Sequence, residues 1–281
     1  MKLHALDSGT FRLDGGAMFG VVPKTLWQKT NPPDDNNLIM MAMRCLLIES
    51  GKRLILIDAG IGHKYNTKFQ QLYQIDHRYT LEASLRAAGF EPSEVTDVVL
   101  THLHFDHCGG ATKHNESGRL TLTFPLARHW VQRSHLDWAL QPNAREKASF
   151  LSENILPLVD SGLLETLDGP AELIPGLELV TVHGHTEGQQ LPLISFKDYK
   201  LLYAADLFPT FGHLPLPYVM GYDTRPLLTL DERSHWLDRI VAEDIVLFYE
   251  HDPHNQCGRV GRNEQGKYYS LETFPLTNLT A

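Results

Sequence analysis

The chain has 281 residues, of which 42% are hydrophobic, and it carries a formal net charge of -9 and 15 histidines. This length and apolar content can bury one large core, which predicts a single α/β domain over residues 1–281. The negative charge would repel a phosphate backbone and no run of lysine and arginine offsets it, so nucleic acid is disfavoured as a partner.

The sequence also bears on cellular location. Residues 1–7 lack the apolar run of about 7 to 15 residues that a signal peptide needs, and no stretch of about 18 apolar residues offers a membrane span. The three cysteines, Cys45, Cys108 and Cys257, are odd in number, which favours a reducing compartment over a disulfide framework. We therefore expect a cytoplasmic protein with neither disulfides nor a membrane partner.

Strand patterns open the chain. Alternating runs at residues 2–6 and 8–13, a break at two glycines and a further run at 18–22 predict an opening hairpin. The polar, proline-containing stretch 28–37 is too long for an ordinary turn. It is interpreted either as a loop that lines a site or as a plain surface loop.

Two strongly apolar runs follow, at residues 43–49 and 54–58, and the turn residues between them predict an antiparallel central pair. Residues 81–88 have the pattern of an amphipathic helix that ends at Gly89. Residues 95–101 are typical of a buried strand, which leads directly into a cluster of histidines.

The remaining pattern alternates helices with strands, without repeats or a clear linker. It therefore indicates a mixed α/β protein. The expected helices are 127–140, 144–156 (stopped by Pro157) and 231–242, and the expected strands are 177–182, 191–196, 200–204 and 245–249.

Three imidazoles and one carboxylate lie within six residues after the strand at 95–101, namely His102, His104, Asp106 and His107. On an extended segment His102 and His104 point the same way, because side chains alternate with a period of two, so both can bind one ion. A turn permitted by Gly109 and Gly110 can direct the other two side chains to a second ion. Without metal, so many buried polar groups would be costly, and we interpret the segment as a metal site.

Two zinc ions need more ligands than this segment supplies. His185, in a glycine-flanked loop, is the next predicted ligand, with His183 as its competitor. Asp206 ends an apolar run, and its two oxygens could bridge two cations, although an aspartate that caps a turn is the alternative. His251 follows another predicted strand and is the last expected ligand, with His254 as a rival.

Asp58 ends a central strand and is predicted to orient a ligand histidine, unless it is only a turn residue. Together with the pattern H-x-H-x-D-H at 102–107, Gly-His-Thr at 184–186, Asp206 and the pair at 251–252, it follows the order of the metallo-β-lactamase superfamily, which the chain resembles. The resemblance implies a four-layer αββα sandwich, with two central sheets flanked by helices, and a dinuclear site along one edge.

The resemblance also implies how the ligands are divided between the two ions. The first ion would be bound by His102, His104 and His185, the second by Asp106, His107 and His251, and both by Asp206. The cofactors expected are two divalent ions, with zinc favoured over manganese or iron. Asp106 and Asp206 are the predicted catalytic residues, since either could carry the proton between nucleophile and leaving group.

Within the superfamily, the position of the last histidine is most similar to the branch that contains acyl-homoserine lactonases. Three residues depart from that branch: Pro209 stands where those lactonases carry a tyrosine, His183 replaces a proline, and Ala205 replaces a frequent glycine. The first departure disfavours homoserine lactones, although Tyr218 or Tyr222 could supply the missing tyrosine. The other two should not abolish metal binding.

These observations predict a hydrolase in which a hydroxide that bridges two metals attacks a lactone or ester of a hydrophobic small molecule. Apolar residues within 207–220, with Met18, Phe19 and Trp27, are expected either to line an apolar pocket or to pack in the core or at a homodimer contact. The alternatives are phosphotriester or phosphodiester hydrolysis and a non-heme iron sulfur dioxygenase of the same fold.

Overall fold

The computed structural model describes residues 1–280, so Ala281, the last residue of the predicted domain, lies outside the described residues. The chain divides into two compact units. Unit 1 comprises Met1–Thr10, Met43–Pro170 and Gly188–Gln190, and unit 2 comprises Phe11–Ala42, Ala171–Glu187 and Leu191–Ala281. The single domain expected from the sequence stays a prediction.

Unit 1 is built on a six-stranded sheet. Residues 11–14 of its first strand and residues 38–42 of its second strand are assigned to unit 2. The strand order is β1 (Lys2–Asp14), β2 (Leu38–Ser50), β3 (Arg53–Ile57), β4 (Asp97–Val99), β7 (Arg128–Gln132) and β8 (Leu164–Leu167). The last four strands are parallel, and β2 pairs with β3 in antiparallel fashion. Parallel strands are usually buried on both faces, which explains the continuous apolar run of β3.

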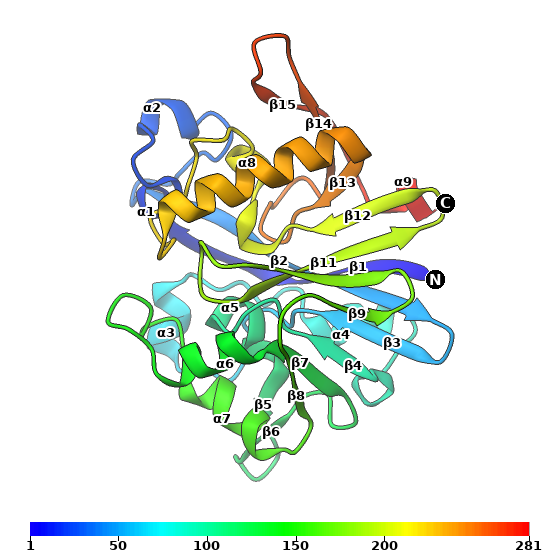
Figure 1. Ribbon diagram of the computed structural model, residues 1–281. Coiled ribbons are helices and arrows are strands. Elements are labelled where there is room, and N and C mark those ends of the chain that lie inside the picture. Colours follow the sequence, from blue (N-terminus) through cyan, green and yellow to red (C-terminus); the bar gives the residue numbers. More distant parts are fainter. Residues whose placement is uncertain (281) are drawn as a thin grey trace. The chain divides into compact units, whose positions relative to one another are not determined.

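Short helices and a small ribbon complete unit 1 (Figure 1). They are α3 (Thr67–Leu72), α4 (Leu81–Ala87), η1 (Pro92–Glu94), α5 (Phe105–Cys108), η2 (Gly109–Ala111), α6 (Arg133–Leu140) and α7 (Ser152–Asp160), with strands β5 (Thr112–His114) and β6 (Leu120–Leu122). The Thr80 hydroxyl caps α4 by accepting from the Ala83 amide, and Leu81 and Leu85, one turn apart, are buried in the core cluster.

Unit 2 is built on a seven-stranded sheet. Its order is β15 (Tyr268–Phe274), β14 (Cys257–Arg262), β13 (Ile245–Phe248), β12 (Tyr199–Tyr203), β11 (Gln189–Phe196), β10 (Leu177–Val182) and β9 (Ala171–Ile174). Its helices are α1 (Gly15–Phe19), α2 (Lys24–Trp27), η3 (Ala205–Leu207), η4 (Phe211–His213), α8 (Pro226–Glu243) and α9 (Thr277–Thr280).

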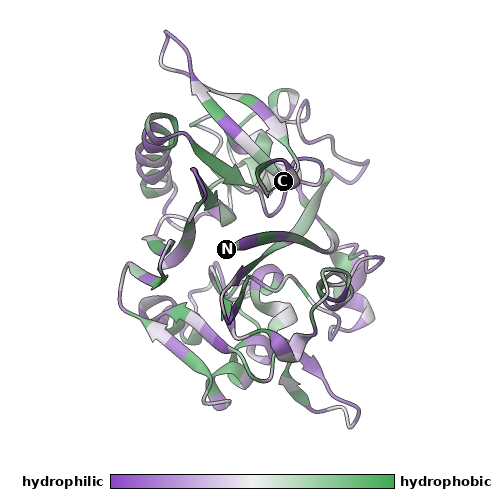
Figure 2. Cartoon of the chain, turned by 90° about the vertical axis from the view of Figure 1, so that its right-hand side faces the viewer, coloured by the Kyte–Doolittle hydropathy of each residue, from purple (hydrophilic) through white to green (hydrophobic). Residues whose placement is uncertain are grey.

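Helix α8 packs against β13 and β14 (Figure 1) and buries Trp236, Leu237 and Ile240. At the top of Figure 2, the tip of the β14–β15 hairpin is hydrophilic, as expected for an exposed turn at residues 263–267. Among residues 1–280, no helix is both long and apolar enough to cross a membrane. Each unit combines a sheet with helices, which confirms the mixed α/β class.

The opening of the chain differs from the predicted hairpin. Strand β1 runs without a turn from Lys2 to Asp14, and α1 replaces the first part of the run predicted at 18–22. The side chain of Asp14 accepts a hydrogen bond from the Ala17 amide and so starts a helix where the alternating pattern predicted a strand.

Two predicted helices are also wrong in part. The first half of the helix expected at 127–140 is strand β7, which lies between β4 and β8 and whose sheet neighbours override its local pattern. The helix expected at 144–156 starts only at Ser152 and continues through Pro157. The carbonyl of Glu153, which Pro157 cannot bond, accepts instead from the Thr112 hydroxyl at 3.0 Å, and this bond makes the proline tolerable.

His129, on β7, is a buried histidine whose burial has a measurable consequence. It lies on the same face of the strand as Val131, which belongs to the core of unit 1, and within the described residues neither ring nitrogen makes a hydrogen bond. Burial lowers the pKa of His129 to about 4, although the Ala127 backbone opposes this in part. The folded protein therefore holds the ring neutral.

We expect His129→Leu to stabilise the protein by about 1 kcal/mol at pH 7.5, because a polar group without a partner leaves the core. The pKa of His129 is lower in the folded protein than its unfolded value of about 6.5. Between pH 6.5 and pH 4 the unfolded state therefore binds more protons, and the stability of the fold decreases as the pH falls. The advantage of the variant should thus grow by about 2 kcal/mol between pH 7 and pH 5. Urea unfolding at pH 7 and pH 5 measures this difference, with the exposed His235→Leu as the control. An equal change in the free energy of unfolding of His129→Leu and of the wild type between the two pH values would contradict the prediction.

Candidate metal centre

The unit 1 part of the predicted site lies at the carboxyl end of the parallel strands. Asp58 follows β3, and the H-x-H-x-D-H motif follows β4. Asp58 accepts from the backbone amide and the hydroxyl of Thr101, both at 2.7 Å, and lies 3.1 Å from Nδ1 of His107. Asp58 also has a left-handed backbone, with φ of 56°, a strained conformation that is often found at functional sites. The predicted contact of Asp58 with a motif histidine is confirmed.

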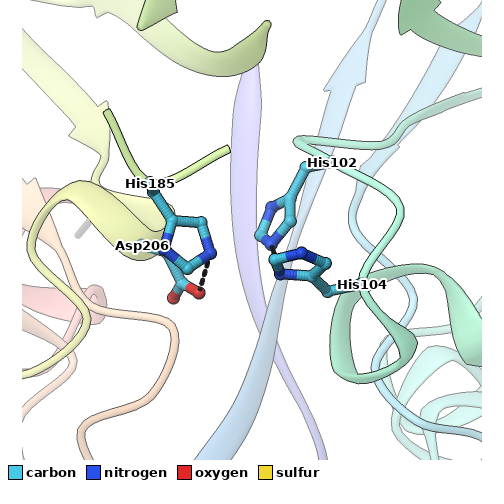
Figure 3. A group of neighbouring side chains, drawn as sticks. All are labelled: His102, His104, His185 and Asp206. Atoms are coloured by element: carbon cyan, nitrogen blue, oxygen red, sulfur yellow. Dashed lines mark hydrogen bonds and ion pairs between the residues drawn. The ribbon is translucent and has the colours of Figure 1, made fainter. Parts of the chain in front are cut away.

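The hydrogen bonds of His102 and His104 assign their tautomers. The Thr101 hydroxyl donates to Asp58, so it accepts from Nδ1 of His102 at 3.1 Å and leaves a lone pair on Nε2 of that ring. Nε2 of His104 donates to the Glu146 carboxylate at 3.4 Å, which leaves a lone pair on its Nδ1. These two lone-pair nitrogens lie 3.0 Å apart (Figure 3). Two lone pairs at this distance repel unless a cation or a proton lies between them.

Asp106 and His107 lie on α5, directly after these histidines, and both are buried. Nδ1 of His107 donates to Asp58, so its Nε2 has the lone pair and lies 3.8 Å from an Asp106 oxygen. The four residues predicted from the motif therefore gather their nitrogen and oxygen donors in one place within unit 1.

Residues outside the motif hold it in position, and no sequence pattern predicted them. Glu146, which orients His104, is itself bound by Trp138 at 2.6 Å and by Asn143 at 2.7 Å. His135 accepts from the backbone amide of Leu103 at 2.8 Å. None of them lies in a recognisable pattern, because their role arises only from the packing of α6 and the following loop on the motif.

The two glycines after the motif have a different role from the one expected. A Cβ atom on Gly110 would lie 2.1 Å from the Ala59 carbonyl oxygen, and one on Gly109 would lie 2.2 Å from that of Ile61. Neither glycine has a positive φ angle. They therefore permit a close approach of the motif to the segment after β3 rather than a sharp turn.

The unit 2 part of the site is set by strand register. In the parallel pair β12 and β13, Tyr203 is opposite Phe248, so Asp206 and His251 each lie three residues beyond paired positions. Nδ1 of His251 donates to the carbonyl of Ala42 at 2.8 Å, and its Nε2 lies 3.2 Å from Oδ1 of Asp206. The register thus brings together two residues that are 45 positions apart in the chain.

His185 faces the other oxygen of the same carboxylate. Its Nδ1 donates to Asp223 at 2.8 Å, and its Nε2 lies 3.0 Å from Oδ2 of Asp206 (Figure 3). Burial lowers the pKa of His185, but the carboxylates of Asp206 and Asp223 outweigh it and raise the pKa to about 10. The same negative charge would favour a bound cation. Asp223 was not expected from the sequence.

The rival histidines lie in more exposed positions than His185 and His251. His183 is partly exposed and pairs with Glu187 at 2.9 Å, while His254 is exposed. Ala205 has φ of 41°, a left-handed conformation that explains why glycine is frequent before the aspartate. The geometry of unit 2 therefore favours His185 and His251.

The segment after Asp206 packs inside unit 2. Phe19 stacks between Trp27 and His213, with ring centroids 5.2 and 4.1 Å away, and meets the edge of Tyr218. The buried Arg233 donates to the carbonyls of Tyr218, at 2.5 Å, and of His213. Of the two interpretations of these apolar residues, core packing therefore describes Phe19 and Trp27, which are both buried.

The chemistry of the donors fits a metal. Asp206 presents one oxygen to each of two histidines, and each histidine directs an Nε2 lone pair at it because its Nδ1 proton is donated elsewhere. An anion and two lone pairs at about 3 Å require a shared cation or added protons. Imidazole nitrogen and carboxylate oxygen are the ligands that zinc takes.

Comparison with known proteins agrees with this chemistry. The sequence signature of the metallo-beta-lactamase superfamily matches residues 44–248. The chain belongs to this superfamily. An N-acyl homoserine lactonase from a Bacillus species is 27% identical over 270 residues, which cover 92% of this chain and 95% of the relative. An N-acyl homoserine lactonase from Bacillus cereus is 26% identical over 235 residues, or 79% and 86% of the two chains.

Two solved structures extend the comparison. A probable metal-dependent hydrolase from Staphylococcus aureus is 28% identical, with a TM-score of 0.86 over 97% of this chain and 98% of that one. AidC, a dizinc quorum-quenching lactonase with a bound homoserine product, is 25% identical, with a TM-score of 0.79 over 97% and 95%. The predicted metallo-β-lactamase fold is confirmed, and the chain is a metal-dependent hydrolase of this superfamily.

Proposed function

We propose that the chain is a lactonase that hydrolyses the ring ester of a hydrophobic small molecule at a dinuclear metal centre. The observation that supports this most is the pair of Nε2 lone pairs that His185 and His251 direct at the two oxygens of Asp206. A carboxylate that is opposed by a separate histidine at each oxygen is suited to bridge two ions.

We also propose that residues 1–281 act as one functional domain, with the ligand set that the family resemblance implies. One ion would be bound by His102, His104 and His185, the other by Asp106, His107 and His251, and both by Asp206, all of which are candidate metal ligands. Zinc is favoured, because a structural relative is described as dizinc, with manganese and iron as alternatives.

The residues of the chain have defined tasks in this proposal. When bound, two such ions lower the pKa of a shared water toward neutrality and polarise the substrate carbonyl. Asp58, Glu146 and Asp223 hold the tautomers of the histidines beside them, which keeps each ligand lone pair directed inward. Asp106 or Asp206 takes the proton of the attacking water and delivers it to the leaving alkoxide.

The relatives named as N-acyl homoserine lactonases support a lactone substrate. Pro209 takes the place of a tyrosine of that branch, and its carbonyl accepts from the His251 amide at 3.1 Å. We therefore propose a lactone with a hydrophobic substituent and assign no particular polar group to the substrate. The cytoplasmic location and the homodimer stay predictions.

The test combines metal content with hydrolysis rates on simple aliphatic lactones, N-acyl homoserine lactones, aromatic esters and a phosphotriester. We expect two zinc or manganese ions per chain, and higher turnover of at least one lactone class than of the phosphotriester. The chelated protein is the control. One iron per chain with oxygen uptake on a persulfide, and no hydrolysis, would replace this proposal with a sulfur dioxygenase.

A further inference from the structure

The loop that carries His185 lies against the beginning of α8. This loop, residues 183–187, follows the end of β10 and belongs to unit 2, as does α8. The backbone amide of Thr224 donates to the carbonyl of His185 at 3.0 Å, and the amide of Arg225 donates to the carbonyl of Gly184 at 2.9 Å. The Thr224 hydroxyl also donates to the His185 carbonyl, at 3.1 Å. The residues directly before α8 therefore bind the carbonyls of the loop.

The amides of the same loop are bound by one side chain of α8. Oε1 of Glu232 accepts from the amide of His183 at 2.6 Å, and Oε2 accepts from the amide of Gly184 at 3.0 Å. Burial raises the pKa of Glu232, and these two amides oppose the rise because they stabilise the charged form. Hydrogen bonds to a carboxylate are stronger than those between neutral groups, so Glu232 holds the peptide groups on both sides of His183.

Gly184 lets the loop approach α8 closely. A Cβ atom at this position would lie 2.4 Å from the amide nitrogen and from Oγ1 of Thr229, which precedes Glu232 by about one turn of the helix. The φ angle of Gly184 is not positive. Glycine is therefore required here by the short distance to the helix rather than by a left-handed backbone, and the loop has little freedom to shift toward α8.

We propose that Glu232 is a positioning residue for His185, because it holds the backbone that leads into this ligand. The inference rests on the proposed function, in which His185 binds one of the metal ions. Nδ1 of His185 donates to Asp223 at 2.8 Å, and Nε2 faces Asp206 at 3.0 Å (Figure 3). Asp223 orients the ring, whereas Glu232 fixes the place of the backbone from which the ring extends. Metal ligands need support of both kinds, since small displacements weaken coordination.

The decisive variant is Glu232→Gln, which keeps one acceptor oxygen but turns an NH2 group toward the other amide. We expect zinc affinity, measured by competition with a chelator, to fall by about tenfold. The visible absorption spectrum of the Co²⁺-substituted protein should also change, because it reports the geometry of the ligands. Asp231→Asn removes an exposed carboxylate from the same helix and should match the wild type in both measurements.

Kinetics at saturating zinc provide a further measurement. Glu232 acts through a metal ligand, so kcat on the best lactone should fall while KM changes by less than about twofold. Glu232 is partly exposed, and a circular dichroism spectrum establishes that Glu232→Gln is folded.

A lower melting temperature of Glu232→Gln with unchanged zinc affinity and an unchanged Co²⁺ spectrum would show a purely structural role and overturn the proposal. Zinc affinity and the Co²⁺ spectrum do not depend on the substrate. A wild type that binds zinc but hydrolyses no lactone would therefore refute the proposed function, while these two measurements would still decide the role of Glu232.

Discussion

Asp206→Ala is expected to reduce lactone hydrolysis by about 10³-fold or more, because loss of a bridging ligand removes several kcal/mol of transition-state stabilisation. Its two oxygens lie 3.0 Å from Nε2 of His185 and 3.2 Å from Nε2 of His251. Removal of the carboxylate therefore affects both histidines at once. Metal content should fall below two ions per chain.

The measurements are metal content by mass spectrometry and kcat/KM on the best lactone from the panel. The matched control is Asp231→Ala, which removes an exposed carboxylate on α8 and should keep two ions and full activity. A circular dichroism spectrum establishes that Asp206→Ala is folded. Two ions per chain in a folded Asp206→Ala protein would refute the bridging assignment.

The second large effect is expected for Asp223→Asn. This change keeps the shape of the side chain but removes the negative charge of the carboxylate whose Oδ1 lies 2.8 Å from Nδ1 of His185. Changes of such supporting carboxylates typically reduce metal affinity or activity by about 10- to 100-fold. We therefore expect weaker zinc binding and a lower kcat. The loss of activity should be smaller than in Asp206→Ala.

Zinc affinity is measured by competition with a chelator of known affinity, and kcat is measured at saturating zinc. Partial recovery of activity with excess zinc would indicate that Asp223 acts by positioning His185. Asp238→Asn is the control, because Asp238 is an exposed aspartate of unit 2 that pairs with Arg262 and Tyr268. Unchanged zinc affinity in Asp223→Asn would contradict the role assigned to its carboxylate.

The kind of donor atoms proposed for the centre could be predicted from the amino-acid sequence. The density of ligands in residues 102–107 and the strands before Asp206 and His251 predict these donors, because a metal site needs particular donors and the ends of neighbouring strands can present them. The preference for His185 over His183 also agrees with the geometry of unit 2, although the sequence left His183 open.

The residues that support these donors, and the places where local patterns fail, could be identified only in the folded chain. Glu146, His135 and Asp223 carry no sequence signal, since hydrogen bonds to a histidine from distant segments depend on packing. In the same way, sheet neighbours make residues Arg128–Gln132 a strand, and one hydroxyl from β5 lets Pro157 stay within α7. Local patterns describe what a segment prefers, whereas contacts between segments far apart in the chain decide which preference prevails.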